Sequence, residues 1–183
     1  MNGRWHQPIS SLAAATLLLL APTSGTGRRW YQGHCYYELK DVANAPRFED
    51  FPAHRPAVTH PARPILATAD ARLYRTVIRE GAAEGPNFAG DFTIVRWGCG
   101  SACVDWAILN ARTGRMFFAE DLRILVNVRG LDDRLTYQPD SRLLVLVGMP
   151  REDAAREGIL FLEWTGAALR RLRYVPAREL CPS

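Results

Sequence analysis

Lysine and long apolar runs are almost absent from this sequence. Lys40 is the one lysine among 23 basic residues, so the formal net charge of +4 at pH 7 comes from arginine. Genomic base composition produces such an arginine bias more often than a nucleic-acid surface does, so the small excess predicts no nucleic-acid partner. The 183 residues are 48% hydrophobic and 23% charged, which excludes a disordered chain, a collagen-like fibre and a multi-pass membrane protein. One sizeable core is expected.

Motifs of the common enzyme classes are also missing. The chain has no phosphate loop, no dinucleotide fingerprint and no zinc-protease motif, so no cofactor and no metal site is predicted. Ser101 has no histidine near it in the sequence, and a catalytic triad would need His34, His54 or His60 from far upstream. An envelope hydrolase that uses two carboxylates stays open as the alternative function. Its candidate carboxylates, at predicted strand ends and turns, are Asp91, Asp105, Asp132, Asp133 and Asp140.

The first 25 residues have the pattern of a secretory signal peptide. Arg4 and His6 precede an apolar run at 9–21, and small or turn-forming residues follow at 22–27. The run is shorter than the roughly 20 residues that span a bilayer, so we expect cleavage near Gly25 and no stable membrane span afterwards. Loss of Arg4 leaves 22 basic and 19 acidic residues, a charge of +3. Because no lipoprotein cleavage box precedes Cys35, the mature protein is predicted to be periplasmic or secreted.

Export makes the four cysteines candidates for disulfides. Three pairings are possible, and the favoured one joins Cys99 to Cys103 and Cys35 to Cys181. Cys99 and Cys103 lie so near in sequence that contact between their side chains is nearly forced. A bond between Cys35 and Cys181 would tie the two ends of the mature chain together. Closing so long a loop stabilises a fold by about 4–5 kcal/mol in the chain-entropy model. A four-thiolate zinc site is disfavoured because paired C-x-x-C motifs are missing.

The remaining chain predicts one α+β domain. Residues 26–64 are rich in aromatics and proline and should form an irregular wrap on the surface, held by Phe48 and Phe51. Residues 65–183 should form one N-terminal helix packed on an antiparallel β-meander of seven or eight strands. The helix is expected over 69–83, with Asp70 as its cap. In the last strand, Arg171 and Arg173 should both lie on the solvent-exposed face. The predicted strands are 91–97, 104–110, 115–119, 122–128, 134–138, 142–147, 159–164 and 169–175.

The densest segment, residues 85–103, carries a recognisable signature. It reads Gly-Pro-Asn-Phe-Ala-Gly at 85–90, then a strand, then Trp-Gly-Cys-Gly-Ser-Ala-Cys at 97–103. In this the chain resembles an uncharacterised family of exported bacterial proteins with a GPNFAG…WGCGxxC signature. The resemblance extends over about residues 48–175, through a hairpin at 110–114 and a Pro-Asp-Ser-Arg turn at 139–142. It implies export but no particular activity. Asp91 stands where members of the family often have histidine.

Two interpretations of this segment stay open. It can be a structural corner, with Phe88 and Trp97 packed inside and glycines where space is short. It can also be a rigid loop that presents residues to a partner, because a disulfide across Cys99 and Cys103 would lower the entropy lost on binding. The candidate binding residues are Asn87, Phe88, Asp91, Gly98, Gly100, Ser101 and Ala102.

The favoured function is therefore a non-enzymatic binding or inhibitor-type module of the cell envelope. Its partner would be an envelope or extracellular protein. A third hypothesis is thiol or copper handling through Cys99 and Cys103, although the helix that follows such a motif in thioredoxin-like proteins is replaced here by a predicted strand.

Overall fold

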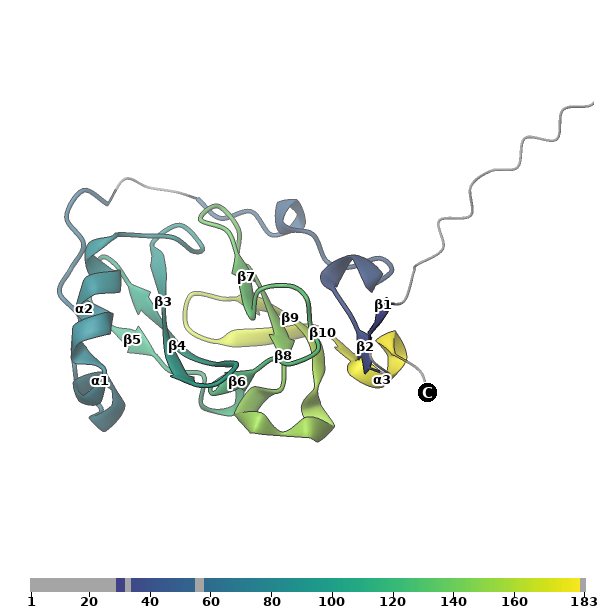
Figure 1. The fold of residues 1–183 in the computed structure, drawn as a ribbon. Helices are drawn as coiled ribbons and strands as arrows, with labels where there is room; N and C mark the ends of the chain where they lie inside the picture. The colour runs from purple at the N-terminus through teal and green to yellow at the C-terminus, as the bar shows by residue number, and fades with distance from the viewer. Residues whose placement is uncertain (1–28, 32–33, 55–57, 182–183) are drawn as a thin grey trace, which may run out of the picture.

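Two antiparallel β-sheets, packed face to face, form the centre of the protein (Figure 1). The structure is a computed structural model that describes residues 29–31, 34–54 and 58–181. The predicted signal peptide, residues 1–25, lies outside the described residues. The first sheet has the order β3-β4-β5, with β6 also paired to β4, and the second has the order β10-β9-β8-β7. The strands are β3 (Phe92–Gly100), β4 (Cys103–Asn110), β5 (Met116–Phe117), β6 (Leu125–Val126), β7 (Leu135–Tyr137), β8 (Leu143–Gly148), β9 (Gly158–Trp164) and β10 (Leu169–Pro176).

Alternating apolar side chains fill the space between the two sheets. Successive side chains of a strand point to opposite faces. Leu144 and Leu146 of β8 therefore meet Ile94 of β3 and Trp106 of β4 across the interface, while Leu143 and its alternate neighbours face outward. All six residues of β8 are buried, as its doubly apolar sequence predicts for a central strand.

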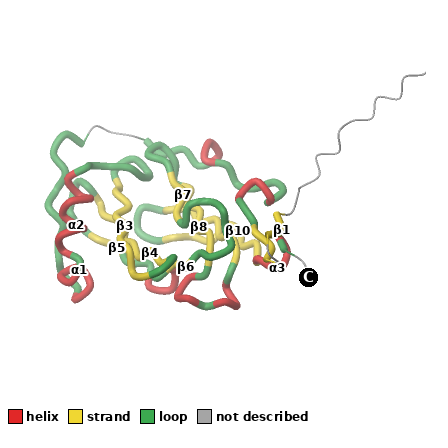
Figure 2. Tube along the Cα trace, in the orientation of Figure 1, coloured by secondary structure: helices red, strands yellow, loops and turns green. Residues whose placement is uncertain are grey.

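The outer face of each sheet has its own cover. Helices α1 (Ala69–Leu73) and α2 (Arg75–Ala83) pack on the first sheet, with Ile78 against Val95 and Trp97. The segment from Tyr37 to Phe51 covers the second sheet together with α3 (Ala177–Leu180). A short hairpin of β1 (Arg29–Tyr31) and β2 (His34–Tyr36) lies beside α3 (Figure 1). Figure 2 shows α1 and α2 on one side of the molecule and α3 on the opposite side.

Five short 3-10 helices complete the described elements. Two belong to the N-terminal segment and three to connections between strands. They are η1 (Leu39–Asp41), η2 (Phe48–Asp50), η3 (Glu120–Leu122), η4 (Pro150–Glu152) and η5 (Ala154–Arg156).

The α+β class with antiparallel strands is confirmed, but several finer predictions were wrong. The strands divide into two facing sheets rather than one meander. The helical segment 69–83 breaks at Tyr74 into α1 and α2. Thr68, not Asp70, caps α1 by accepting a hydrogen bond from the N–H of Ala71 at 3.1 Å. The carboxylate of Asp70 is bound instead to Arg123 at 2.6 Å, a contact that local sequence does not reveal.

The strands predicted at 115–119 and 122–128 are also shorter than expected. Only Met116–Phe117 and Leu125–Val126 pair as strands, because η3 turns the chain between them. The last strand has an irregularity between Arg171 and Arg173, where the register against β9 shifts. These two arginines therefore lie on opposite faces, contrary to the simple alternation expected from the sequence.

Both predicted disulfides are confirmed. Cys35 is bonded to Cys181, and Cys99 to Cys103, so the described part of the chain has no free cysteine. The first bond joins β2 to the residue after α3, and the second closes the turn between β3 and β4. No helix among the described residues has the length and hydropathy needed to cross a bilayer.

Glu163 makes the second sheet sensitive to acid. Its carboxylate accepts a hydrogen bond from Arg142 at 2.9 Å and is paired with Arg170. The hydrogen bond from Arg170, with that from Arg142, lowers the pKa of Glu163 below its ordinary value. The folded state thus favours the charged carboxylate. The stabilisation is complete above the unfolded pKa of about 4.3 and is lost as the pH falls through the lower folded value.

We predict that Glu163→Gln lowers the free energy of unfolding by about 1 kcal/mol at pH 7, because two charge-assisted hydrogen bonds are weakened. The difference between variant and wild type should shrink as the pH falls from 5 to 2.5. Urea unfolding at a series of pH values measures it. A difference that stays constant down to pH 2.5 would contradict the assignment of this acid sensitivity to Glu163.

Candidate functional site

The turn between β3 and β4 is a short hairpin whose end is closed by a disulfide. The regular pairing runs to Gly98 opposite Val104, and after an irregularity Gly100 pairs with Cys103. Gly100 has a φ of +139° and Ala102 a φ of +55°, so the backbone reverses sharply over residues 100–102. We call residues 98–103 the hairpin tip. Gly98, Cys99, Gly100 and Ser101 are exposed.

Neighbouring segments hold the hairpin tip in place from one side. The carbonyl oxygen of Ala102 accepts hydrogen bonds from the backbone N–H of Asn127 at 3.1 Å and from Nε of Arg134 at 2.8 Å. Cys103 also pairs with Val126 of β6. The disulfide and these bonds together fix both the shape of the tip and its orientation.

The loop that supplies those donors is itself fixed by hydrogen bonds within the loop and to the N-terminal segment. We call residues 127–134 the supporting loop. The side chain of Asn127 accepts a hydrogen bond from the N–H of Gly130 at 2.7 Å. The N–H of Leu131 donates to the carbonyl of Tyr37 at 2.8 Å, and the carboxylate of Asp132 accepts from the N–H of Leu39.

Two apolar side chains stand out from the supporting loop. Val128 is 57% exposed and Leu131 is 45% exposed. Exposed apolar side chains of this kind can contribute contact area when a protein partner binds. They lie on the same loop that donates hydrogen bonds to Ala102.

A hollow of about 340 Å³ lies beside the hairpin tip. It is lined by Arg96, Trp97, Gly98, Cys103, Val104, Asp133 and Arg134. Arg96 and Asp133 form an ion pair at 2.6 Å, and the hydrogen bond that Arg96 donates to Asp133 raises the pKa of Arg96 above its ordinary value. The ring of Trp97 lies 4.7 Å from that of Tyr74 of the helical segment. The hollow is shallow, polar at its rim and continuous with the tip.

The candidate binding residues of the signature do not form one site. Gly98, Gly100, Ser101 and Ala102 lie in the hairpin tip, whereas Asn87, Phe88 and Asp91 lie before the start of β3. A strand of nine residues separates the two groups by about 26 Å at about 3.3 Å per residue. Sequence proximity suggested a single site, but an extended strand carries the two halves of the signature to opposite ends of a sheet.

The first half of the signature is a structural corner. The side chain of Asn87 binds both the N–H and the carbonyl of Ile94, at 2.7 and 3.1 Å. Phe88 is fully buried between the sheets. The N–H of Gly90 donates to the carbonyl of Pro139 at 2.8 Å, so this corner fastens the first sheet to the turn before β8. Asn87 and Phe88 are therefore removed from the candidate site.

Asp91 also has a local partner. Its carboxylate pairs with Nε of Arg112, in the turn after β4, at 2.9 Å. This pair ties the start of β3 to the neighbouring turn. Asp91 therefore belongs with the corner and not with the hairpin tip.

The carboxylates considered for a hydrolase are mostly engaged in structural contacts. Asp105 is bound to Arg123, Asp133 to Arg96 and Asp91 to Arg112. Asp132 accepts from the backbone of Leu39. These partners differ and lie on different elements, so the four carboxylates do not converge on one cleft. Within the described residues no group of three histidine, cysteine, aspartate or glutamate side chains could hold a metal ion.

Sequence reasoning missed the supporting loop. Val128, Leu131 and Arg134 fall in or near segments that were predicted as strands. The signal that could have indicated a loop is the sequence Asn-Val-Arg-Gly at 127–130, since asparagine and glycine are frequent in turns. The sequence at 127–130 does not reveal the contact with Ala102, because Asn127 lies 25 positions after Ala102 in the chain.

Comparison of the chain with protein-family models, with curated proteins and with solved structures found no match. The geometry of the described residues is therefore the basis for the function. Two disulfides fit a protein located outside the cytoplasm.

Proposed function

We propose that this chain is an exported, non-enzymatic binding module, and that its docking surface consists of the hairpin tip and the supporting loop. The observation that carries the proposal is an exposed hairpin tip held rigid by a disulfide and by two hydrogen bonds to one carbonyl, that of Ala102. A preorganised surface loses little conformational entropy when a partner binds.

The chemistry of this surface suits a protein partner. Val128 and Leu131 provide exposed apolar area, and Arg96, Asp133 and Arg134 provide a polar rim near the tip. Apolar centres with polar rims are the usual anatomy of protein–protein interfaces. At Gly98 and Gly100 an added Cβ would meet nothing within 4 Å, so the backbone of the tip is open to close approach.

An envelope or extracellular protein is the proposed class of partner, and the periplasm or the exterior is the proposed location. Support comes from the signal-peptide pattern of residues 1–25 and from the two disulfides. The resemblance to exported bacterial proteins supports the same compartment. An inhibitor-type role agrees with a rigid loop that projects from a sheet.

The test is Ser101→Arg in the full-length chain. Ser101 is exposed at the turn, so arginine there should fold normally but place a bulky charge in the interface. We expect affinity for the envelope partner to fall at least tenfold, measured by quantitative co-purification and by titration of the partner once identified. The midpoint of thermal unfolding should remain within about 2 °C of wild type.

The matched control is Ala167→Arg. Ala167 is exposed in the turn between β9 and β10, so this variant adds the same charge in another hairpin. It should bind the partner as wild type does. Equal loss of binding in both variants, or none in Ser101→Arg, would show that the hairpin tip is not the docking surface.

A further inference from the structure

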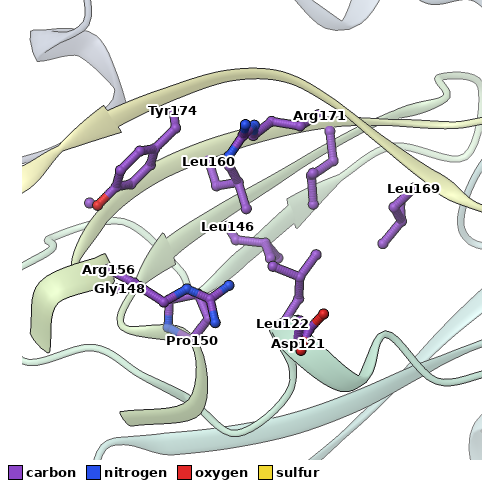
Figure 3. Close-up of a pocket in the computed structure, with 12 residues that line it drawn as sticks. Asp121, Leu122, Leu146, Gly148, Pro150, Arg156, Leu160, Leu169, Arg171 and Tyr174 are labelled. Carbon is purple, nitrogen blue, oxygen red and sulfur yellow. The ribbon is translucent and has the colours of Figure 1, made fainter. Parts of the chain in front are cut away.

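A second candidate site lies on the inner face of the second sheet. A cavity of about 500 Å³ opens between β8–β10 and the connections that carry η3, η4 and η5 (Figure 3). Its volume lies in the range of about 300–1,000 Å³ that is typical of small-molecule sites. The cavity and the hollow beside the hairpin tip share no lining residue, although Gly148 of the cavity lies against Asn127 of the supporting loop.

Leucine side chains form the main apolar part of the wall of this cavity. They come from three neighbouring strands and from η3, and they are Leu122, Leu146, Leu160, Leu162 and Leu169. Leu162 and Leu146 are continuous with the core between the sheets, whereas Leu160, Leu169 and Leu122 are only partly buried. The core is thus open to solvent here, and apolar area remains that a ligand can cover.

Two arginines flank the leucines. Arg156 ends η5 and Arg171 lies on β10. In Figure 3 their guanidinium groups lie on either side of Leu146 and Leu160. Arg171 faces the cavity because it pairs across the strands with Leu162, an inner-face residue, whereas the register shift turns Arg173 toward the outer face beside Phe161.

Neither guanidinium forms an ion pair or donates a hydrogen bond among the described residues, unlike the neighbouring arginines on β10. Arg156 interacts electrostatically with Tyr174, which also lines the cavity. Arg170 is paired with Glu163, and Arg173 donates to the carbonyl of Ala43 at 2.7 Å. The cavity also contains the carboxylate of Asp121. Two arginines and one aspartate leave one net positive charge beside an apolar wall.

We propose that this cavity binds a fatty acid of medium chain length. The alkyl chain lies along the leucines, and the carboxylate lies in the positive field of Arg156 and Arg171. Guanidinium groups bind carboxylates with strong, charge-assisted hydrogen bonds. A single alkyl chain suits a cavity of about 500 Å³, and a single negative charge balances the net charge of the lining.

The test is a series of hexanoate, octanoate and decanoate added to the full-length, oxidised protein below their micelle concentrations. Burial of each methylene contributes enough to tighten binding about fourfold, so isothermal titration should show affinity rising about 16-fold for each two carbons. Decanol, which has the chain without the charge, should bind at least tenfold more weakly than decanoate. Absence of saturable binding, or equal affinity for decanol and decanoate, would overturn the proposal without any variant.

The variant Arg156→Gln/Arg171→Gln removes the positive charge of the cavity and leaves its leucine wall unchanged, so it tests the contribution of the charge alone. Since neither side chain bonds to the protein, the variant should fold as wild type does. It should lose at least tenfold in affinity for decanoate and keep its affinity for decanol. The control Arg75→Gln/Arg79→Gln removes the same charge from exposed positions on α2 and should change neither affinity. Equal loss in the control, or unchanged decanoate binding in the cavity variant, would overturn the role of the two arginines.

Discussion

Replacing both Cys35 and Cys181 by serine is expected to lower the free energy of unfolding by about 5 kcal/mol. The bond joins residues 146 positions apart. In the chain-entropy model, the freedom that a disulfide removes from the unfolded chain grows with the length of the closed loop, and a loop of this length corresponds to about 5 kcal/mol. That is a large share of the roughly 5–15 kcal/mol that stabilises an ordinary domain.

The structure adds a native-state reason for the same effect. Cys35 is 4% exposed, and Leu180 and Cys181 pack against the cluster that covers the second sheet. Without the bond, β2 and α3 would be held to each other by side-chain packing alone. We therefore expect the N-terminal segment and α3 to exchange their amide hydrogens faster in the variant.

The matched control is replacement of both Cys99 and Cys103 by serine. This bond spans only 4 positions, so the same model gives a loss of about 2 kcal/mol. Urea unfolding of the two variants, with wild type beside them, measures the difference. Equal losses would show that loop length does not govern the contribution of the Cys35–Cys181 bond.

Asp105→Ala is expected to lower the free energy of unfolding by about 3 kcal/mol. Asp105 and Arg123 are 3% and 5% exposed, and their side chains form two hydrogen bonds at 2.9 and 2.6 Å. The hydrogen bonds that Arg123 donates to Asp105 raise the pKa of Arg123 above its ordinary value. Arginine stays charged, so removal of its partner leaves a buried charge, which costs about 3–5 kcal/mol. We expect the lower end because Asp70 remains bound to Arg123.

Two further variants make this prediction specific. Asp133→Ala breaks the exposed pair with Arg96, whose side chains are 46% and 55% exposed, and should cost less than about 1 kcal/mol. The double change Asp105→Leu/Arg123→Met removes both buried charges and should be more stable than Asp105→Ala alone. If Asp105→Ala costs no more than Asp133→Ala, the buried pair is not a major determinant of stability.

Patterns along the chain predicted the features that depend on neighbouring residues. Residues 143–147 are all apolar. Because successive side chains of a strand point to opposite faces, both faces of this strand are apolar, which predicted a buried central strand. The helix boundaries near residues 69 and 83 followed from the spacing of Ile78 and its apolar neighbours. A separation of only 4 positions between Cys99 and Cys103 made their bond nearly unavoidable.

The candidate site was only half predicted. The hairpin tip could be found because glycines and cysteines concentrate there. The supporting loop could not, because its role depends on hydrogen bonds from Asn127 and Arg134 to Ala102, and no local pattern encodes such a contact. Asn87 and Phe88 were misassigned since a corner that joins two sheets has the same residue types as a binding loop.

By itself, the sequence determined the class of the fold, the positions of its longer strands and the two disulfides. The alternation of apolar and polar residues, the turn residues and the spacing of the cysteines are properties of short segments or of the chain ends. Their effects do not depend on how the rest of the chain folds. Tertiary structure alone decided that the strands form two facing sheets, that Arg123 is buried against Asp105, and that Arg171 faces a leucine-lined cavity. Those outcomes depend on which segments pack together, because strand pairing, desolvation of charge and a register shift are settled by partners that are not neighbours in the sequence.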